Sequence, residues 1–172
     1  KCNPGFYSQV GATACPHCPA GKFSATTGAS ACSTCSGGTV SSLGSNSCDK
    51  CPTGKYDNSN NVCTACSAGK YIHLTGSTTC LSCAAGKYSQ AGADGCGTCT
   101  PGKFAATAVS DSCDTCLAGQ YSGAGATTCT SCAAGYYAQA AGSSMCSKCP
   151  VGTYSTGKAA TCTQCAKGTY QP

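Results

Sequence analysis

Cysteine pairs of the form Cys-x-x-Cys recur along the whole chain at a nearly constant interval, and this spacing restricts the fold more than any other feature. The ten pairs are Cys15/Cys18, Cys32/Cys35, Cys48/Cys51, Cys63/Cys66, Cys80/Cys83, Cys96/Cys99, Cys113/Cys116, Cys129/Cys132, Cys146/Cys149 and Cys162/Cys165. Successive pairs begin 15 to 17 residues apart. Fixed self-similarity of this kind is typical of a stacked repeat, so we expect one continuous array over residues 1–172.

The second cysteine of each pair opens a short phrase, Cys-x-x-Gly-x-aromatic. Cys2 opens the same phrase without a cysteine before it. All eleven copies keep the glycine: Gly5, Gly21, Gly38, Gly54, Gly69, Gly86, Gly102, Gly119, Gly135, Gly152 and Gly168. Ten copies keep the aromatic residue, and Val40 is the exception. The glycine predicts a tight turn with positive φ. We expect the aromatic, the one large apolar side chain of its module, to cover the disulfides.

Because Cys2 carries the phrase alone, the repeating unit runs from the second cysteine of one pair to the first cysteine of the next. This gives ten modules, numbered here in chain order, at 2–15, 18–32, 35–48, 51–63, 66–80, 83–96, 99–113, 116–129, 132–146 and 149–162, with a partial eleventh at 165–172. A second glycine lies four residues before the closing cysteine in seven loops, at Gly11, Gly28, Gly44, Gly76, Gly92, Gly125 and Gly142. It predicts the return turn of a short hairpin-like loop.

Composition excludes an ordinary hydrophobic core. Leu, Ile, Val and Phe together number only 13 of 172 residues, whereas cysteine numbers 21, so covalent bonds or metal must replace the core. No apolar period of 3.6 residues is present, which argues against helices. The predicted fold class is therefore a small disulfide-rich repeat, an elongated rod or solenoid of ~16–17-residue modules with short β-hairpin-like loops and little regular secondary structure.

Two interpretations of the cysteines are open at this point. In the first, disulfides close each loop: Cys2–Cys15, Cys18–Cys32, Cys35–Cys48, Cys51–Cys63, Cys66–Cys80, Cys83–Cys96, Cys99–Cys113, Cys116–Cys129, Cys132–Cys146 and Cys149–Cys162, with Cys165 left unpaired. Closing a loop of this size stabilises a fold by about 3 kcal/mol in the chain-entropy model. In the second, two neighbouring pairs form a four-cysteine zinc site, and His17, inside the first pair, is either a zinc ligand or an exposed turn residue.

The phrase Cys-x-x-Gly-x-Tyr/Phe-Ser followed by Cys-x-x-Cys resembles the ephrin-receptor-like cysteine-rich repeat of the growth-factor-receptor cysteine-rich superfamily. One module also resembles the first loop of a tumour-necrosis-factor-receptor repeat. In those relatives the cysteine before the glycine closes its loop with the cysteine that ends it, which is the disulfide pairing given above. Receptor modules alternate with other disulfide patterns, whereas this chain repeats one module. Long arrays of a single module resemble surface proteins of protists and algae, including surface antigens and mastigoneme shafts.

Few residues suggest a chemical site. No pair of carboxylates and no nucleophile beside a base indicates catalysis, so we expect no enzyme and no cofactor. Lysines at one module position, Lys22, Lys55, Lys70, Lys87 and Lys103, form either a solvated edge or a basic stripe that attracts acidic glycans. Hydroxyl residues before the closing cysteines are either turn residues or O-glycosylation sites: Thr13, Ser30, Ser77, Thr78, Thr79, Thr127, Thr128, Ser143 and Ser144.

The sequence therefore predicts an extracellular or cell-surface structural protein, a stalk or a component of a fibre or filament. The alternatives are a receptor, adhesion or surface-antigen ectodomain that binds a protein or glycan, and a zinc-binding array of four-cysteine sites. The expected partners are further copies of the chain or more modules of a longer parent chain, and O-linked glycans. The net charge is only +5 without clustered basic residues, which argues against nucleic acid. The lack of any long apolar run argues against membrane insertion of this segment.

Overall fold

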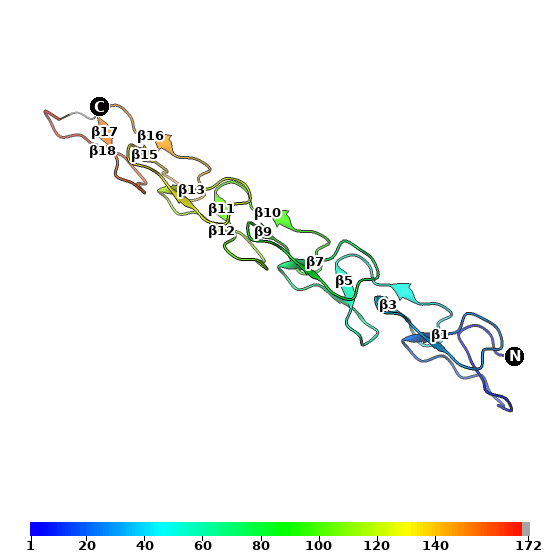
Figure 1. The fold of residues 1–172 in the computed structure, drawn as a ribbon. Coiled ribbons are helices and arrows are strands. Elements are labelled where there is room, and N and C mark those ends of the chain that lie inside the picture. The colour runs from blue at the N-terminus through cyan, green and yellow to red at the C-terminus, as the bar shows by residue number, and fades with distance from the viewer. Residues whose placement is uncertain (170–172) are drawn as a thin grey trace. The chain divides into compact units, whose positions relative to one another are not determined.

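The computed structural model describes residues 1–169. These residues contain no helix and form nine two-stranded antiparallel hairpins, which recur along the chain in Figure 1. The hairpins pair β1 (Lys22–Phe23) with β2 (Ser33–Thr34), β3 (Thr39–Val40) with β4 (Asp49–Lys50), β5 (Lys55–Asp57) with β6 (Cys63–Ala65), β7 (Lys70–Tyr71) with β8 (Leu81–Ser82), β9 (Lys87–Tyr88) with β10 (Gly97–Thr98), β11 (Lys103–Phe104) with β12 (Asp114–Thr115), β13 (Gln120–Tyr121) with β14 (Thr130–Ser131), β15 (Tyr136–Tyr137) with β16 (Ser147–Lys148) and β17 (Thr153–Tyr154) with β18 (Thr163–Gln164).

Each hairpin follows from the order of residues in its module. The phrase glycine makes the turn, and the residue after it and the aromatic form the first strand. The two residues between a closing cysteine and the next opening cysteine form most of the second strand, as in the pairing of Lys22 with Thr34 and of Phe23 with Ser33. Module 1 has a single bridge in place of the strands, between Phe6 and His17.

Ten disulfides close the ten loops. They join the same cysteines as the loop-closing interpretation of the sequence: 2 with 15, 18 with 32, 35 with 48, 51 with 63, 66 with 80, 83 with 96, 99 with 113, 116 with 129, 132 with 146 and 149 with 162. The Cα–Cα distances across them are 5.4 to 5.8 Å. Cys165 carries a free thiol. The fold class of a small disulfide-rich repeat is thereby confirmed, and the elongated overall shape stays a prediction.

The chain divides into two compact units. Unit 1 consists of Lys1–Leu81 with Ala91–Gly95, and unit 2 consists of Ser82–Gln90 with the chain from Cys96 onward. Within each unit the modules pack on one another in sequence order, mostly through the same backbone contacts. Between modules 3 and 4, side chains provide two of the acceptors, since Gly38 N–H donates to Asp57 Oδ2 and Ser41 N–H donates to Asn61 Oδ1.

Within each unit, backbone hydrogen bonds join one module to the next. Between modules 1 and 2, Gly5 N–H donates to the Ser24 carbonyl at 2.9 Å, Ser8 N–H to that of Ala29 at 3.0 Å, and Gly28 N–H to that of Cys2 at 2.8 Å. The junction of modules 7 and 8 has the equivalent bonds. There Gly102 N–H donates to Ser122 at 2.9 Å, Ala105 N–H to Ala126 at 3.1 Å, and Gly125 N–H to Cys99 at 2.8 Å. Neighbouring modules are thus joined mainly through backbone atoms, which any sequence can provide.

The buried side chains are small. Eight loop-opening cysteines are no more than 2% exposed: Cys2, Cys18, Cys51, Cys66, Cys83, Cys99, Cys116 and Cys132. The residue after the aromatic is also buried, at Ser24, Ser41, Asp57, Ile72, Ser89, Ala105, Ser122, Ala138 and Ser155. Among the described residues, the aromatics of the phrase are half-buried, apart from the exposed Tyr154. The position after the aromatic is thus more deeply buried than the aromatic, and it holds Ser or Ala in most modules, with Asp57 and Ile72 as the larger exceptions.

Candidate functional site: pockets between consecutive modules

A pocket with the same pattern of lining positions recurs between consecutive modules. It lies at the junctions of modules 4 and 5, 6 and 7, 7 and 8, and 8 and 9, with volumes of about 540, 260, 290 and 500 Å³. We call these the junction pockets. The first belongs to unit 1 and the other three belong to unit 2.

Three module positions line every junction pocket. The aromatic of the first module contributes a ring, from Tyr56, Tyr88, Phe104 or Tyr121. The strand residue after the phrase glycine of the second module forms a wall, from Lys70, Lys103, Gln120 or Tyr136. A residue just before the closing cysteine of the second module forms another wall, from Thr79, Ser112, Thr128 or Met145.

The short hairpin holds each ring in place. Tyr88 on β9 pairs with Gly97 on β10, and a Cβ on Gly97 would lie only 3.0 Å from a ring carbon of Tyr88. The ring therefore lies across its own hairpin, with one part against the backbone and another part facing the pocket. An aromatic ring with a face toward solvent is a common element of ligand sites, because it offers a rigid apolar surface.

The four pockets differ in charge. Lysine lines two of them, Lys70 at modules 4 and 5 and Lys103 at modules 6 and 7. The pocket of modules 7 and 8 has Asp114 and Gln120 instead, and the pocket of modules 8 and 9 has Tyr136 and Met145. Repetition of the backbone thus produces the same cavity with a different chemical lining at each junction.

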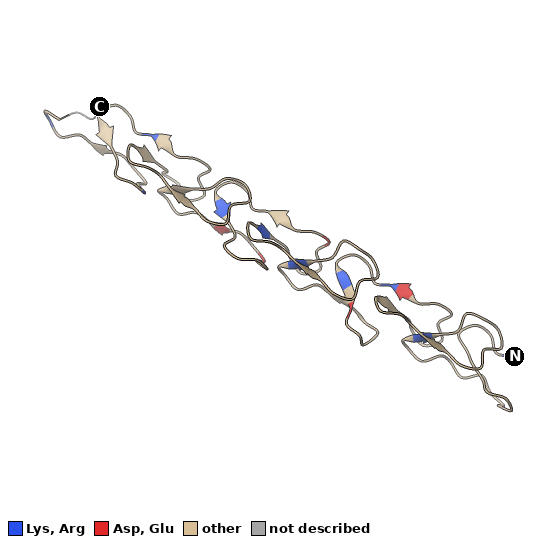
Figure 2. Ribbon diagram, in the orientation of Figure 1, with Lys and Arg blue, Asp and Glu red and all other residues tan. Residues whose placement is uncertain are grey.

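The lysines at the shared module position lie on β1, β5, β7, β9 and β11, where Figure 2 colours basic residues. Lys22, Lys55, Lys87 and Lys103 are exposed, and Lys70 is half-buried. The sequence placed these residues on one edge of the module but gave no indication that two of them line pockets. Sequence patterns singled out Thr79 as a candidate O-glycosylation residue, but they missed Thr100 and Ser112, because the ring that lines their pocket belongs to another module.

The structure separates the candidate O-glycosylation residues into two groups. Ser77 and Ser143 are half-buried, and their hydroxyls donate to the carbonyls of Leu74 and Ala140 at 3.0 and 2.7 Å. These two residues match the turn interpretation. The others are exposed: Thr13, Ser30, Thr78, Thr79, Thr127, Thr128 and Ser144. Of these, Thr79, Thr127 and Thr128 also line junction pockets.

The cysteines of modules 1 to 10 that the zinc interpretation requires as ligands form disulfides in the structure. Every cysteine of modules 1 to 10 is in a disulfide, and a disulfide sulfur is not the thiolate that zinc requires. His17 is exposed, and its ring lies against the Phe6 ring with centroids 4.3 Å apart. Among residues 1–169, no group of three or more His, Cys, Asp and Glu side chains is placed to hold a metal ion.

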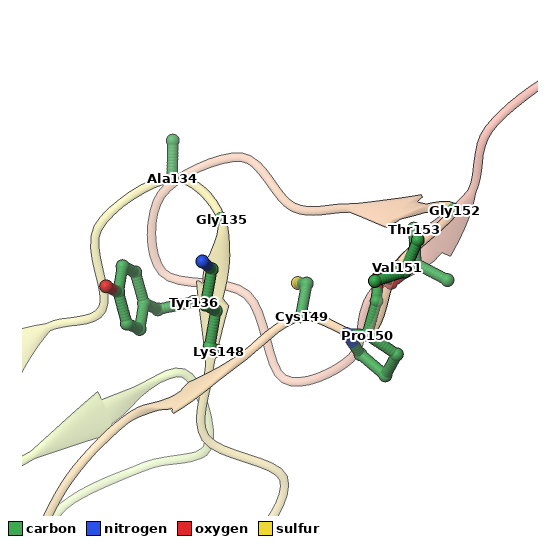
Figure 3. A pocket seen from close by; sticks show the side chains of 9 residues that line it. All are labelled: Ala134, Gly135, Tyr136, Lys148, Cys149, Pro150, Val151, Gly152 and Thr153. Carbon is green, nitrogen blue, oxygen red and sulfur yellow. Dashed lines mark hydrogen bonds between the residues drawn. The ribbon is translucent and has the colours of Figure 1, made fainter. Parts of the chain in front are cut away.

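A further pocket of about 400 Å³ lies between the phrases of modules 9 and 10 (Figure 3). Gly135, Tyr136, Pro150 and Gly152 are among the residues that line it. Within the described part of the chain, no atom lies within 4 Å of a Cβ built on Gly135 or Gly152. A Cβ on the phrase glycine Gly102, in contrast, would overlap the carbonyl oxygen of the return turn two modules later. Among the described residues, the phrase glycines of modules 9 and 10 thus have open space at the Cβ position.

Comparison with known proteins agrees with this architecture. Residues 119–160, which cover most of modules 8 to 10, match a family model described as tyrosine-protein kinase ephrin type A/B receptor-like. None of the curated proteins matches the chain. Across residues 1–169 no helix has the length and apolar character that a membrane crossing demands. The matched segment and the regular ladder of disulfide-closed modules identify the chain as a cysteine-rich repeat protein, similar in residues 119–160 to the ephrin type A/B receptor-like family.

Proposed function

We propose that this chain is an extracellular structural array, a stalk or a component of a fibre. The observation that carries the proposal is the repetition of one backbone-mediated junction along modules that each close on a disulfide. Disulfides persist in oxidising compartments, and receptor-like cysteine-rich repeats are in keeping with that setting. A ligand-binding ectodomain, in contrast, is expected to concentrate distinctive side chains in one region.

The disulfides would make such an array resist extension. Each disulfide holds the ends of its loop 5.4 to 5.8 Å apart, and the three peptide units between the cysteines of a pair add about 11 Å. A pulled module therefore reaches roughly 17 Å, whereas about 16 fully extended residues reach ~56 Å. The loops remain short under load, which suits a stalk or fibre exposed to shear and proteases.

Location tests the proposal most directly. Immunogold labelling of intact source cells, with antibodies raised against the folded chain, should decorate stalks or fibres outside the cell. Label found only inside permeabilised cells would overturn it. Stretching of single molecules should show roughly a threefold gain in contour length after reduction, with reduced and alkylated protein as the control.

The second candidate, a receptor or adhesion ectodomain, is favoured by the variation among the junction pockets. Saturable binding of a soluble protein ligand to a few modules, lost on substitution of those modules only, would support it over the structural role.

We also propose that the partners are modules of the same kind, from further copies of the chain or from a longer parent chain. The backbone hydrogen bonds that join one module to the next support this, because every further module of this kind offers the same donors and acceptors. Lys148 lines the pocket between the phrases of modules 9 and 10. Cross-linking of native material should join Lys148 to a lysine of another copy or of additional modules, and cross-links confined to residues 1–172 of one molecule would contradict the proposal.

A further inference from the structure

We propose that the junction pockets lined by lysine, at modules 4 and 5 and at modules 6 and 7, bind an acidic saccharide unit, one that carries a carboxylate or sulfate. The inference does not depend on the structural role proposed above. It rests on three features of the pockets: a ring, hydroxyl groups and a single cation.

The ring supplies an apolar surface of the right kind. A pyranose has a face of C–H groups and a periphery of hydroxyls, so it fits a site with one aromatic face and several small polar groups. Tyr88 provides the face at modules 6 and 7, and Thr100 and Ser112 provide the hydroxyls. At modules 4 and 5 the same roles fall to Tyr56, Ser67 and Thr79. These groups are few and convergent, as in ordinary small-molecule sites.

The size of the pockets favours sugars over larger ligands. The volume of about 260 Å³ lies just below the range for small-molecule sites, roughly 300–1,000 Å³, and the volume of about 540 Å³ lies in its lower half.

Charge selects an acidic unit over a neutral one. Lys103 is exposed and lines its pocket, and no Asp is among the described residues that line either lysine pocket. The whole chain carries ten Lys against five Asp and no Glu, so its field also attracts anions. The pocket of modules 7 and 8, with Asp114 and Gln120, is an internal negative control.

The test is titration of the full, oxidised chain with a sulfated disaccharide, followed by ¹H–¹⁵N and aromatic NMR. We expect weak binding with a Kd on the order of millimolar, and shifts at Tyr88, Thr100, Lys103 and Ser112. The unsulfated disaccharide should bind at least about threefold more weakly, and added salt should weaken binding of the sulfated form.

Two variants make the test specific. Lys103→Gln should abolish the shifts at modules 6 and 7 and leave those around Lys70. Lys158→Gln removes the same charge from an exposed return turn outside the junction pockets, and should leave the local shifts unchanged. Equal weakening by both variants would show general charge attraction only and would overturn the proposal. Equal binding of the unsulfated sugar, or shifts that map outside the junction pockets, would do the same.

Discussion

Each module has two turns that bend the chain in the same way but tolerate different residues. The phrase turn and the return turn both place one residue at positive φ in the left-handed region. All eleven phrase positions are glycine, whereas Ser59, Val109 and Lys158 occupy three of the ten return-turn positions, with φ of 67°, 65° and 62°. Backbone conformation alone therefore does not explain why the phrase position is always glycine.

The difference lies in what surrounds the two turns. At six of the phrase glycines a Cβ would strike a backbone carbonyl oxygen of the return turn two modules later, as for Gly38 against Gly76, Gly54 against Gly92 and Gly86 against Gly125. A Cβ at a return turn meets no described atom at Gly11 and side-chain atoms at Gly76, Gly125 and Gly142. A side chain can move aside, but the carbonyl belongs to a turn that is itself hydrogen-bonded to the module between them.

The largest effect should come from placing a Cβ where the backbone is closest. Gly102→Ala combines the left-handed conformation, about 1–2 kcal/mol for a non-glycine residue, with overpacking of roughly 1–3 kcal/mol. We expect the free energy of unfolding to fall by about 3 kcal/mol, as measured by denaturant titration of the oxidised chain. Gly152→Ala is the matched control, because its φ of 79° is close to the 83° of Gly102 and its Cβ would meet no described atom. Gly152→Ala should lower the free energy of unfolding by only about 1 kcal/mol. Equal losses would show that close approach is irrelevant.

A smaller loss of stability is expected at a phrase glycine that lies against a side chain and not against a backbone carbonyl. A Cβ on Gly21 would lie 3.3 Å from Cγ of Asn61, whose amide accepts from Ser41 N–H and donates to the Ser41 carbonyl, both at 2.8 Å. Gly21→Ala should therefore lower the free energy of unfolding by about 2 kcal/mol, which is between the effects of the two previous variants. In the variant Asn61→Ala the added cost of Gly21→Ala should shrink toward about 1 kcal/mol. A Gly21→Ala loss as large as that of Gly102→Ala would remove the distinction between side chain and backbone.

The smallest effect, and one of opposite sign, should follow from relaxing a return turn. Val109 is β-branched at positive φ, which is unfavourable, and its N–H donates to the Cys83 carbonyl at 3.0 Å. Val109→Gly should keep that bond and stabilise the chain by about 0.5–1 kcal/mol, after the greater freedom of glycine in the unfolded state is subtracted. Hydrogen exchange at the residue 109 amide should slow accordingly. A faster rate would mean that the Val109 side chain contributes packing that outweighs its strain.

The sequence predicted the module accurately but not what surrounds it. Cys2, which carries the phrase without a preceding cysteine, was enough to favour loop-closing disulfides, and the structure has that pairing. Sequence patterns did not single out the position after the aromatic, where Ala105 and Ser122 are at most 3% exposed whereas Phe104 and Tyr121 are half-buried. A repeated Ser or Ala after the aromatic was the available sign, because a position that is small in most copies indicates limited space.

The junction pockets could not be predicted, because their walls come from different modules. Tyr88 and Lys103 are 15 residues apart in the sequence and line one cavity, but the same spacing recurs all along the chain. Only the packing of one module on the next decides which ring faces which strand.

What the sequence determined by itself is the closed module, because its parts are local. The disulfide, the phrase glycine, the return turn and the short strands all lie within about 16 residues, and turn chemistry and loop closure act at that range. The tertiary structure decided the contacts between modules, namely the backbone hydrogen bonds at each junction and the approach of Gly102 to Gly142. Backbone amides and carbonyls are the same in every residue, so a surface built from them leaves little trace in the sequence beyond the glycines that make room for it.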